Sequence, residues 1–241
     1  MISVYDLGPS THPETQASGA SPFVRIVIYI LRYKKIPHEI ITIGWSDIQR
    51  IAPELGAPPT ILTPTPKYTI PFIKDSTTGK VVSDSAAIAE YLDEAYPDTP
   101  TVVPANSIVL HKIFMSDYAT RLQELFRVVL RPKIIPHFPK EYRDLNQSLM
   151  LSPATPEAVE GAFGKVKEEL EKLHQILSGG APYRKFIMGD KPTFADFALV
   201  AFTYPLKFLN GEDSDEWKQL QSMAGGWIGW EIDQLSKTIA L

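Results

Sequence analysis

The stretch from Tyr68 to Pro97 constrains the fold of this chain more than any other part of the sequence. Its pattern predicts a β-strand that contains Pro71, a turn at Thr77–Gly79 and a short returning strand. A proline removes one donor from a β-ladder, so it belongs on an edge or has a special purpose, such as a cis peptide bond. We therefore predict a hairpin whose backbone at Ile70–Pro71 can pair with an extended molecule such as a peptide.

A helix is predicted directly after this hairpin, from Asp84–Ser85 to Ala95. Asp and Ser are favoured at helix N-termini because their side chains accept hydrogen bonds from unpaired backbone N–H groups. The same pair suits a second role, since a carboxylate binds a free amino group, and a hydroxyl with helix N–H groups binds a carboxylate. The two roles are compatible, and together with Pro71 we favour a ligand site.

These residues resemble the glutathione-binding signature of glutathione transferases. In that family an Ile-Pro or Val-Pro strand precedes a hairpin and an acid–Ser pair that opens a helix. Here the positions read Ile70–Pro71 and Asp84–Ser85. The resemblance implies that the Ile70–Pro71 backbone holds the cysteinyl part of glutathione, and that Asp84 and Ser85 hold its γ-glutamyl group.

Residues 1–97 predict a thioredoxin-like α/β domain. Its expected elements are a strand at 2–6, a helix at 22–35, a strand at 38–43 and the hairpin described above. A strand–helix–strand order predicts a parallel strand pair. We expect a long loop over residues 7–20, and the five prolines from Pro53 to Pro66 predict an extended connection.

Residues 106–241 predict an all-helical second domain, which follows a proline-rich linker at residues 96–104. Apolar residues recur at helical spacing over residues 108–130 and 156–177. The first of these helices is expected to stop at Arg131–Pro132, with an irregular bridge after it. Its predicted apolar stripe consists of Leu110, Ile113, Phe114, Tyr118, Leu122, Leu125, Phe126 and Val129.

Residues 189–196 resemble a second signature of the same family, which caps the central helix of its helical domain. Thr193 and Asp196 have the spacing of a capping box, with Asp in place of the usual Glu. The implied role is structural. With both motifs in the family's order, the resemblance extends over essentially the whole chain and implies the glutathione transferase fold.

Members of this family hold glutathione as its thiolate, which is the nucleophile. The chain has no cysteine, so a cysteine nucleophile, a disulfide and a zinc–thiolate site are excluded. Hydroxyl donors to the thiolate are Tyr5, Ser18 and Ser21. We predict Ser21 as the catalytic residue, because it directly precedes the helix at 22–35 and Ser21–Val24 resembles bacterial β-etherases and the fungal class FuA.

The group that holds the glycyl carboxylate of glutathione departs from the family pattern. Many transferases place a long polar side chain just before the Ile-Pro pair, whereas this chain has Thr69 there and Lys67 two residues earlier on the same predicted strand face. We expect Lys67 and Thr69 to contribute to the site. Trp45 is an alternative, although a buried anchor is its expected role.

The second substrate is expected against the first long helix, at Tyr118, Arg121, Leu122, Leu125 and Phe126. Most of this stripe must be core, and its aromatic content suggests an apolar aromatic ligand. The resemblance thus implies conjugation of glutathione to aromatic electrophiles, with cleavage of aryl ethers as a further reaction. The alternative is a glutathione-dependent carrier for aromatic compounds with little turnover.

Composition excludes several other functions. The net charge of −4 and the absence of a basic run argue against nucleic-acid binding. The longest apolar stretch, residues 23–33, is interrupted by two arginines and is too short to span a membrane. A strand follows Met1 at once, so we expect no signal peptide and a cytoplasmic location. No metal is expected, and the resemblance implies a homodimer.

Overall fold

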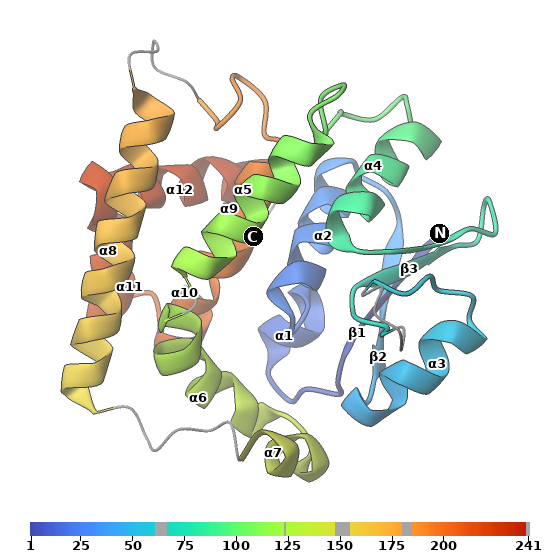
Figure 1. Ribbon diagram of the computed structural model, residues 1–241, viewed down its shortest axis with the longest axis horizontal. Helices are drawn as coiled ribbons and strands as arrows, with labels where there is room; N and C mark the ends of the chain where they lie inside the picture. The colour runs from blue at the N-terminus through green and yellow to red at the C-terminus, as the bar shows by residue number, and fades with distance from the viewer. Residues whose placement is uncertain (61–66, 123, 148–154, 180–184, 240–241) are drawn as a thin grey trace. The chain divides into compact units, whose positions relative to one another are not determined.

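The computed structural model describes residues 1–60, 67–122, 124–147, 155–179 and 185–239. The chain divides into two compact units, residues 1–111 and residues 112–241. The first unit contains a four-stranded sheet with helices packed on it, and the second is helical (Figure 1).

The sheet has the strand order β2-β1-β3-β4. β1 (Ile2–Leu7) pairs in parallel with β2 (His38–Ile43) and antiparallel with β3 (Phe72–Asp75), which pairs antiparallel with β4 (Val81–Ser83). The predicted parallel strand pair is confirmed, with α2 (Pro22–Tyr33) between its strands in the sequence. The predicted thioredoxin-like class of this unit is confirmed as well.

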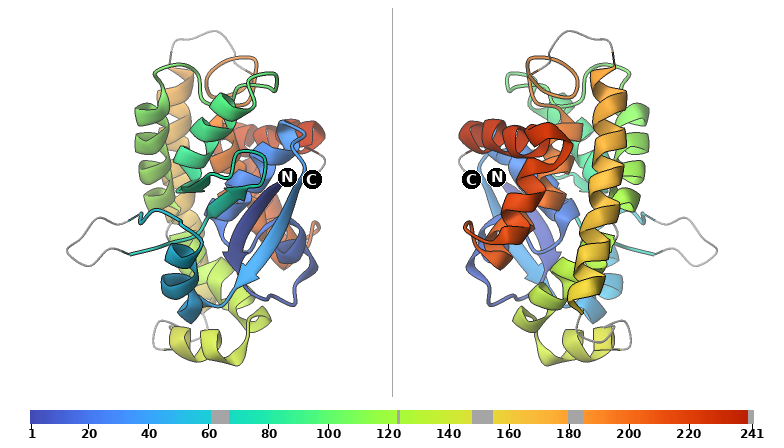
Figure 2. Two further views of the ribbon diagram at one scale, coloured as in Figure 1. Left: turned by 90° about the vertical axis from the view of Figure 1, so that its right-hand side faces the viewer. Right: turned by 90° about the vertical axis from the view of Figure 1, so that its left-hand side faces the viewer.

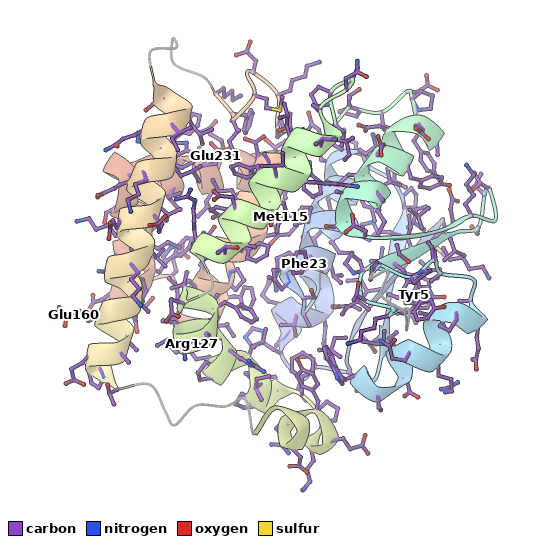
Figure 3. The ribbon with its side chains drawn as sticks, in the orientation of Figure 1. Tyr5, Phe23, Met115, Arg127, Glu160 and Glu231 are labelled. Carbon is purple, nitrogen blue, oxygen red and sulfur yellow. The ribbon has the colours of Figure 1, made fainter. Side chains whose placement is uncertain are left out.

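Helices cover both faces of the sheet because β1 alternates buried side chains between them. α2 packs against β1 and against α4 (Ser85–Ala95) on one face, and α3 (Ile48–Glu54) lies on the other (Figure 1). On the α3 face, Tyr5 (labelled in Figure 3) is buried. Its ring stacks on that of Phe72, which is also buried, with ring centroids 4.3 Å apart.

The prediction that a strand contains Pro71 is wrong, because β3 begins at Phe72. The Ile70–Pro71 peptide bond is cis. Pro71 has no N–H to give to a ladder, but its carbonyl accepts a hydrogen bond from the Asp84 N–H at 3.2 Å. The segment that precedes the hairpin is therefore held at its end without being part of the sheet.

Two segments that were predicted to be irregular contain helices. The loop over residues 7–20 includes α1 (Pro13–Ser18), where the His12 side chain caps the helix and proline stands at a favoured early position. Pro53 lies inside α3, near its end, so the extended connection starts later than predicted. Pro64 and Pro66 lie outside the described residues.

The first long helix of the second half is also different from the prediction. α5 (Ile108–Arg121) is followed by a π-helical segment, η2 (Leu125–Leu130), and then by α6 (Arg131–Ile134). Pro132 therefore does not stop the helix. It stands in the first turn of α6, where a missing N–H costs little.

In the first turns of α5 the buried face differs from the predicted stripe. Leu110 and Ile113 are 63% and 61% exposed, whereas His111, Met115 and Tyr118 are buried. The first turns of α5 therefore bury a face beside the predicted stripe, whereas Tyr118 and, further along, Leu122, Leu125 and Val129 of that stripe are buried as predicted. The first turns of α5 thus expose apolar side chains.

The core of the helical unit is α9 (Phe194–Thr203), in which every residue is buried. α8 (Pro156–Ser178) forms as predicted and runs beside the C-terminal helices (Figure 2). Asp196 accepts hydrogen bonds from the Thr193 N–H and hydroxyl, so the predicted capping interaction is present. The other helices are α7 (Lys140–Gln147), η3 (Ile135–His137), α10 (Pro205–Asn210), α11 (Asp215–Ser222), η4 (Met223–Gly226) and α12 (Trp227–Ile239).

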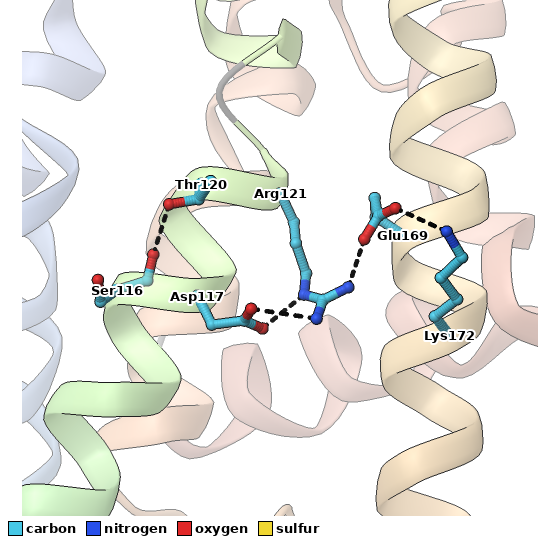
Figure 4. Close-up of polar contacts among 6 residues, drawn as sticks. All are labelled: Ser116, Asp117, Thr120, Arg121, Glu169 and Lys172. Atoms are coloured by element: carbon cyan, nitrogen blue, oxygen red, sulfur yellow. Dashed lines mark hydrogen bonds and ion pairs between the residues drawn. The ribbon is translucent and has the colours of Figure 1, made fainter.

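An ion-pair network joins α5 to α8 (Figure 4). The Arg121 guanidinium donates to Asp117 on its own helix, at 2.5 Å from Nε, and to Glu169 on α8. Lys172 donates to the other oxygen of Glu169 at 2.9 Å. Because Arg121 and Glu169 are half-buried, this network is better shielded than an isolated surface pair.

Candidate functional site

Three chain segments meet at one edge of the sheet. The register places Tyr5 beside Phe72 and Phe72 beside Ser83. Because β3 runs antiparallel to β1 and β4, the residues after Tyr5, before Phe72 and after Ser83 all lie at the same edge. This edge, which we call the site edge, therefore carries the end of β1, the Ile70–Pro71 pair and the start of α4.

Asp84 caps α4 from an unusual backbone conformation. Its φ and ψ are 79° and 128°, a region that residues other than glycine rarely adopt. Its Oδ1 accepts hydrogen bonds from the N–H groups of Ala86 and Ala87, each at 3.1 Å. Oδ2 makes no hydrogen bond to the described residues, and Asp84 is exposed while Ser85 is buried. The predicted capping role is confirmed, and it uses only one of the two carboxylate oxygens.

Ser21 stands at the N-cap of α2 but does not cap it with its side chain. Its backbone is extended, Pro22 follows at the first helical position, and the hydroxyl makes no capping hydrogen bond. The Ser21 side chain is half-buried. A hydroxyl that is not used for capping can donate to another group near the helix N-terminus.

Asp6 attaches the start of α2 to the end of β1. Its buried carboxylate accepts hydrogen bonds from the N–H groups of Leu7 at 2.7 Å, Ala20 at 2.5 Å and Ser21 at 3.4 Å. Burial raises the pKa of Asp6 to about 6, against the opposing effect of these hydrogen bonds and of Arg25. Asp6 was not predicted as a site residue. Its position in the first strand, among apolar neighbours, is the sequence feature that indicates a buried acid with a structural role.

The two alternatives to Ser21 lie in closed surroundings. Ser18 is buried, and its hydroxyl lies 3.4 Å from a carboxylate oxygen of Glu14. Tyr5 is part of the core on the α3 face (Figure 3). Burial and then the charge of Glu39 raise the pKa of Tyr5. Neither residue combines an accessible hydroxyl with the start of a long helix.

Lys67 and Thr69 do not lie on a strand face, contrary to the prediction. The Thr69 hydroxyl is hydrogen-bonded to the Thr60 hydroxyl at 2.7 Å, and the Lys67 carbonyl accepts from the Thr60 N–H at 3.0 Å. The Lys67 side chain is exposed. Trp45 is 50% exposed, so its expected role as a buried anchor is wrong.

Most of the expected second-substrate surface is core. Tyr118, Leu122 and Leu125 are buried, and the Tyr118 hydroxyl donates to the Leu199 carbonyl at 3.2 Å. Arg121 is engaged in the network of Figure 4. The residues of this group that are not fully buried are therefore Arg121 and Phe126.

The described ranges contain neither a membrane-spanning helix nor a cluster of metal ligands. No helix there is both long and apolar enough to cross a bilayer. The same residues contain no group of three or more His, Cys, Asp or Glu side chains placed to hold a metal ion.

The fold and the site edge define a thioredoxin-like unit followed by a helical unit, the architecture of glutathione transferases. Comparison with protein families agrees. The glutathione S-transferase N-terminal domain family matches residues 20–95, and the C-terminal domain family matches residues 111–237. The chain belongs to the glutathione S-transferase family.

Its relatives include several fungal proteins. The glutathione S-transferase-like protein ustS of Aspergillus flavus is 30% identical over an alignment that covers 90% of this chain and 83% of that protein. A glutathione S-transferase of Ceriporiopsis subvermispora, solved in complex with glutathione, has a TM-score of 0.86 and 29% identity, covering 98% of this chain and 97% of that one. Glutathione transferase GSTFuA3 from Phanerochaete chrysosporium has a TM-score of 0.83 and 26% identity, covering 98% and 96%.

Proposed function

We propose that this protein binds glutathione at the site edge, stabilises its thiolate and transfers it to hydrophobic aromatic electrophiles. The observation that carries the proposal is the convergence of Ile70–Pro71, Asp84–Ser85 and the Ser21 end of α2, which Asp6 ties to β1. The glutathione complex of the similar protein from C. subvermispora supports the ligand.

In this proposal each part of glutathione has a matching group. Asp84 receives the γ-glutamyl amino group on Oδ2, the oxygen that the cap does not use. The γ-glutamyl carboxylate accepts from the Ser85 hydroxyl and from N–H groups at the start of α4. The Ile70 backbone pairs with the cysteinyl residue beside Pro71. Lys67 and Thr69 lie toward the glycyl end, where Lys67 supplies a positive charge.

Ser21 is the proposed thiolate stabiliser. Lowering the thiol pKa by about two units takes roughly 2.7 kcal/mol of differential stabilisation. A hydrogen bond to a charged group contributes about 1.5–3 kcal/mol, and a helix N-terminus adds about 0.3–1 kcal/mol. The Ser21 hydroxyl and α2 together therefore suffice for the required shift.

The proposed chemical step is attack of the glutathione sulfur on an electrophilic carbon of the second substrate. A carbon–sulfur bond forms while the bond to the leaving group breaks, and the leaving group takes the electron pair. With an aryl ether the leaving group is a phenolate, which takes up a proton from water. Turnover with a panel of aromatic electrophiles and ethers separates this enzyme from a carrier that only binds such compounds.

The substitution Ser21→Cys tests the role of Ser21. A cysteine at a helix N-terminus next to bound glutathione is expected to have a lowered pKa and to form a mixed disulfide. The variant should lose conjugation and gain glutathione-dependent reduction of small disulfides. Because the natural chain has no cysteine, mass spectrometry after incubation with oxidised glutathione identifies the adduct, and alkylation against pH gives the thiol pKa.

Ser18→Cys is the matched control, because Ser18 is close in sequence but buried. Its thiol should react slowly and take up no glutathione. If the thiol of Ser21→Cys behaves in the same way, the proposed role passes from Ser21 to another hydroxyl.

We also propose a homodimer that covers the exposed apolar side chains of α5. Val109, Leu110 and Ile113 are all exposed there, and a patch of this kind marks an interaction site. Sedimentation should show a dimer at micromolar concentration, and Ile113→Glu should shift it to monomer. Ile176→Glu on α8 is the control, since Ile176 is 71% exposed but distant in sequence from the patch. A monomeric wild-type protein would refute the proposal.

A further inference from the structure

Gln49 of α3 holds the backbone of Tyr68 through both ends of its side-chain amide. Gln49 Nε2 donates to the Tyr68 carbonyl at 2.7 Å, and Gln49 Oε1 accepts from the Tyr68 N–H at 3.1 Å. A neighbouring β-strand would supply the same pair of hydrogen bonds. The two backbone partners also fix which end of the amide is which, because an N–H only donates and a carbonyl only accepts.

The segment that Gln49 holds lies outside the sheet. β3 begins at Phe72, so residues 68–71 precede the ladder. Pro71 is held on one side, where its carbonyl accepts from the Asp84 N–H at 3.2 Å. On the other side Gln49 holds Tyr68. Ile70, whose backbone is the proposed partner of the cysteinyl residue, lies between these two anchors.

α3 is a firm base for this contact. Ile48 and Ala52, on either side of Gln49 in the sequence, are buried in the core on the α3 face. Tyr68 and Ile70 pack against the same core with partly buried side chains. The Gln49 amide therefore ties the segment to the same core that the side chains of Tyr68 and Ile70 contact. Because the amide binds main-chain atoms, it fixes the position of the Tyr68 backbone.

We infer that Gln49 is a positioning residue that holds the Ile70–Pro71 backbone ready for glutathione, an inference that rests on the proposed function. Without the amide, residues 67–70 keep fewer anchors and must be ordered when the ligand binds. Ordering backbone at binding lowers affinity, and for a single residue the expected loss is about tenfold. The chemical step should be unaffected, because Ser21 is held by Asp6 and not by this segment.

The experiment compares the wild-type protein with Gln49→Ala, Gln49→Glu and Arg50→Ala. Arg50→Ala is the matched control, since Arg50 is adjacent on α3 and pairs with Asp47 and Glu54. Calorimetry gives the Kd for glutathione, steady-state kinetics give KM and kcat, and hydrogen exchange of the protein without ligand gives the protection of the Tyr68 amide.

For Gln49→Ala we expect Kd and KM for glutathione to rise about tenfold, with kcat at saturating glutathione within about twofold of wild type. Tyr68 amide exchange should accelerate before any ligand is added. Gln49→Glu should also weaken binding, because its second oxygen faces the Tyr68 carbonyl instead of donating to it. Arg50→Ala should match wild type.

Three results would overturn the inference. The first is an unchanged Kd in Gln49→Ala while the wild-type protein binds glutathione. The second is a raised Kd with unchanged Tyr68 exchange, which would mean that Gln49 touches the ligand directly. The third is a parallel loss of kcat and melting temperature, which would mean a general structural role. A wild-type protein that bound no glutathione would instead remove the proposed function itself, and the wild-type titration alone shows this.

Discussion

Replacing Asp84 with alanine is expected to abolish the rise in melting temperature that glutathione gives to the wild-type protein. A ligand that binds only the native state stabilises it by about 2.7 kcal/mol at a hundred times its Kd. In the proposed complex this stabilisation depends on the Asp84 carboxylate, which pairs with the γ-glutamyl amino group. The loss should appear in thermal unfolding with and without glutathione and as a large increase in the calorimetric Kd.

Alanine at position 84 also removes the cap of α4, so a second variant is needed. Loss of a cap costs about 1 kcal/mol of stability, and alanine tolerates the positive φ of 79° poorly. Asn is as good an N-cap residue as Asp and also tolerates positive φ, but its side chain carries no charge. Asp84→Asn should therefore keep the melting temperature of the free protein and still lose most of the affinity. Wild-type affinity in both variants would contradict the proposed site.

The second large effect is expected in the helical unit, where Glu231→Gln should stabilise the protein at neutral pH. Glu231, which is labelled in Figure 3, is 0% exposed, and so is Asp196. Within the described part of the chain, neither carboxyl oxygen of Glu231 has a partner at full hydrogen-bonding geometry, although Asp196 and Trp227 lie close enough to act on this carboxyl. Asp196 accepts hydrogen bonds from the Ile187 N–H at 2.7 Å and from the Thr193 N–H at 2.7 Å, so both of its oxygens already have backbone donors.

The pH dependence follows from the pKa of Glu231. Burial and then the charge of Asp196 raise it from 4.5 to about 10. The contribution of Glu231 to stability is fully present below its pKa in the unfolded protein. It is lost as the pH rises through neutrality toward its pKa in the folded protein. A glutamine stays neutral and can donate to Asp196 at every pH. The free energy of unfolding of Glu231→Gln should thus exceed that of the wild-type protein by little near pH 4.5 and by on the order of 3 kcal/mol at pH 7.

Urea unfolding at about pH 5, 7 and 9 measures this difference. Glu168→Gln is the control, because Glu168 is exposed and pairs with Lys172 on the surface of α8. That substitution should change stability little at any pH. Wild-type and Glu231→Gln curves that run parallel across this range would show that Glu231 is not held protonated in the folded protein.

Much of the chain could be predicted because local patterns determine it. β1 and β2 follow from alternation, α2 from Pro22 after a residue type that is common at helix N-termini, and α4 from the Asp84–Ser85 start. The capping interaction of Asp196 with Thr193 depends on a spacing of three residues. In each case the partners are close in sequence, so propensity and spacing carry the information.

Predictions failed where partners are distant in sequence. The apolar residues Leu110 and Ile113 suggested the wrong buried face for the first turns of α5, because the face that is buried depends on which elements pack against it. The strand was expected to include Pro71, but its first ladder partner, Tyr5, fixes its start at Phe72. α1 was missed although its proline and capping residue were visible.

The sequence by itself determined the order of strands and helices, the two helix starts of the site and the Ile70–Pro71 pair, because each depends on neighbouring residues. Only the tertiary structure decided how these parts are connected. Asp6 reaches the N–H of Ala20, Gln49 reaches Tyr68 and Glu231 lies near Asp196. Such contacts join residues that are far apart in the chain, and they become favourable only when packing has already brought the segments together, since the entropy of closing the intervening loop opposes them until then.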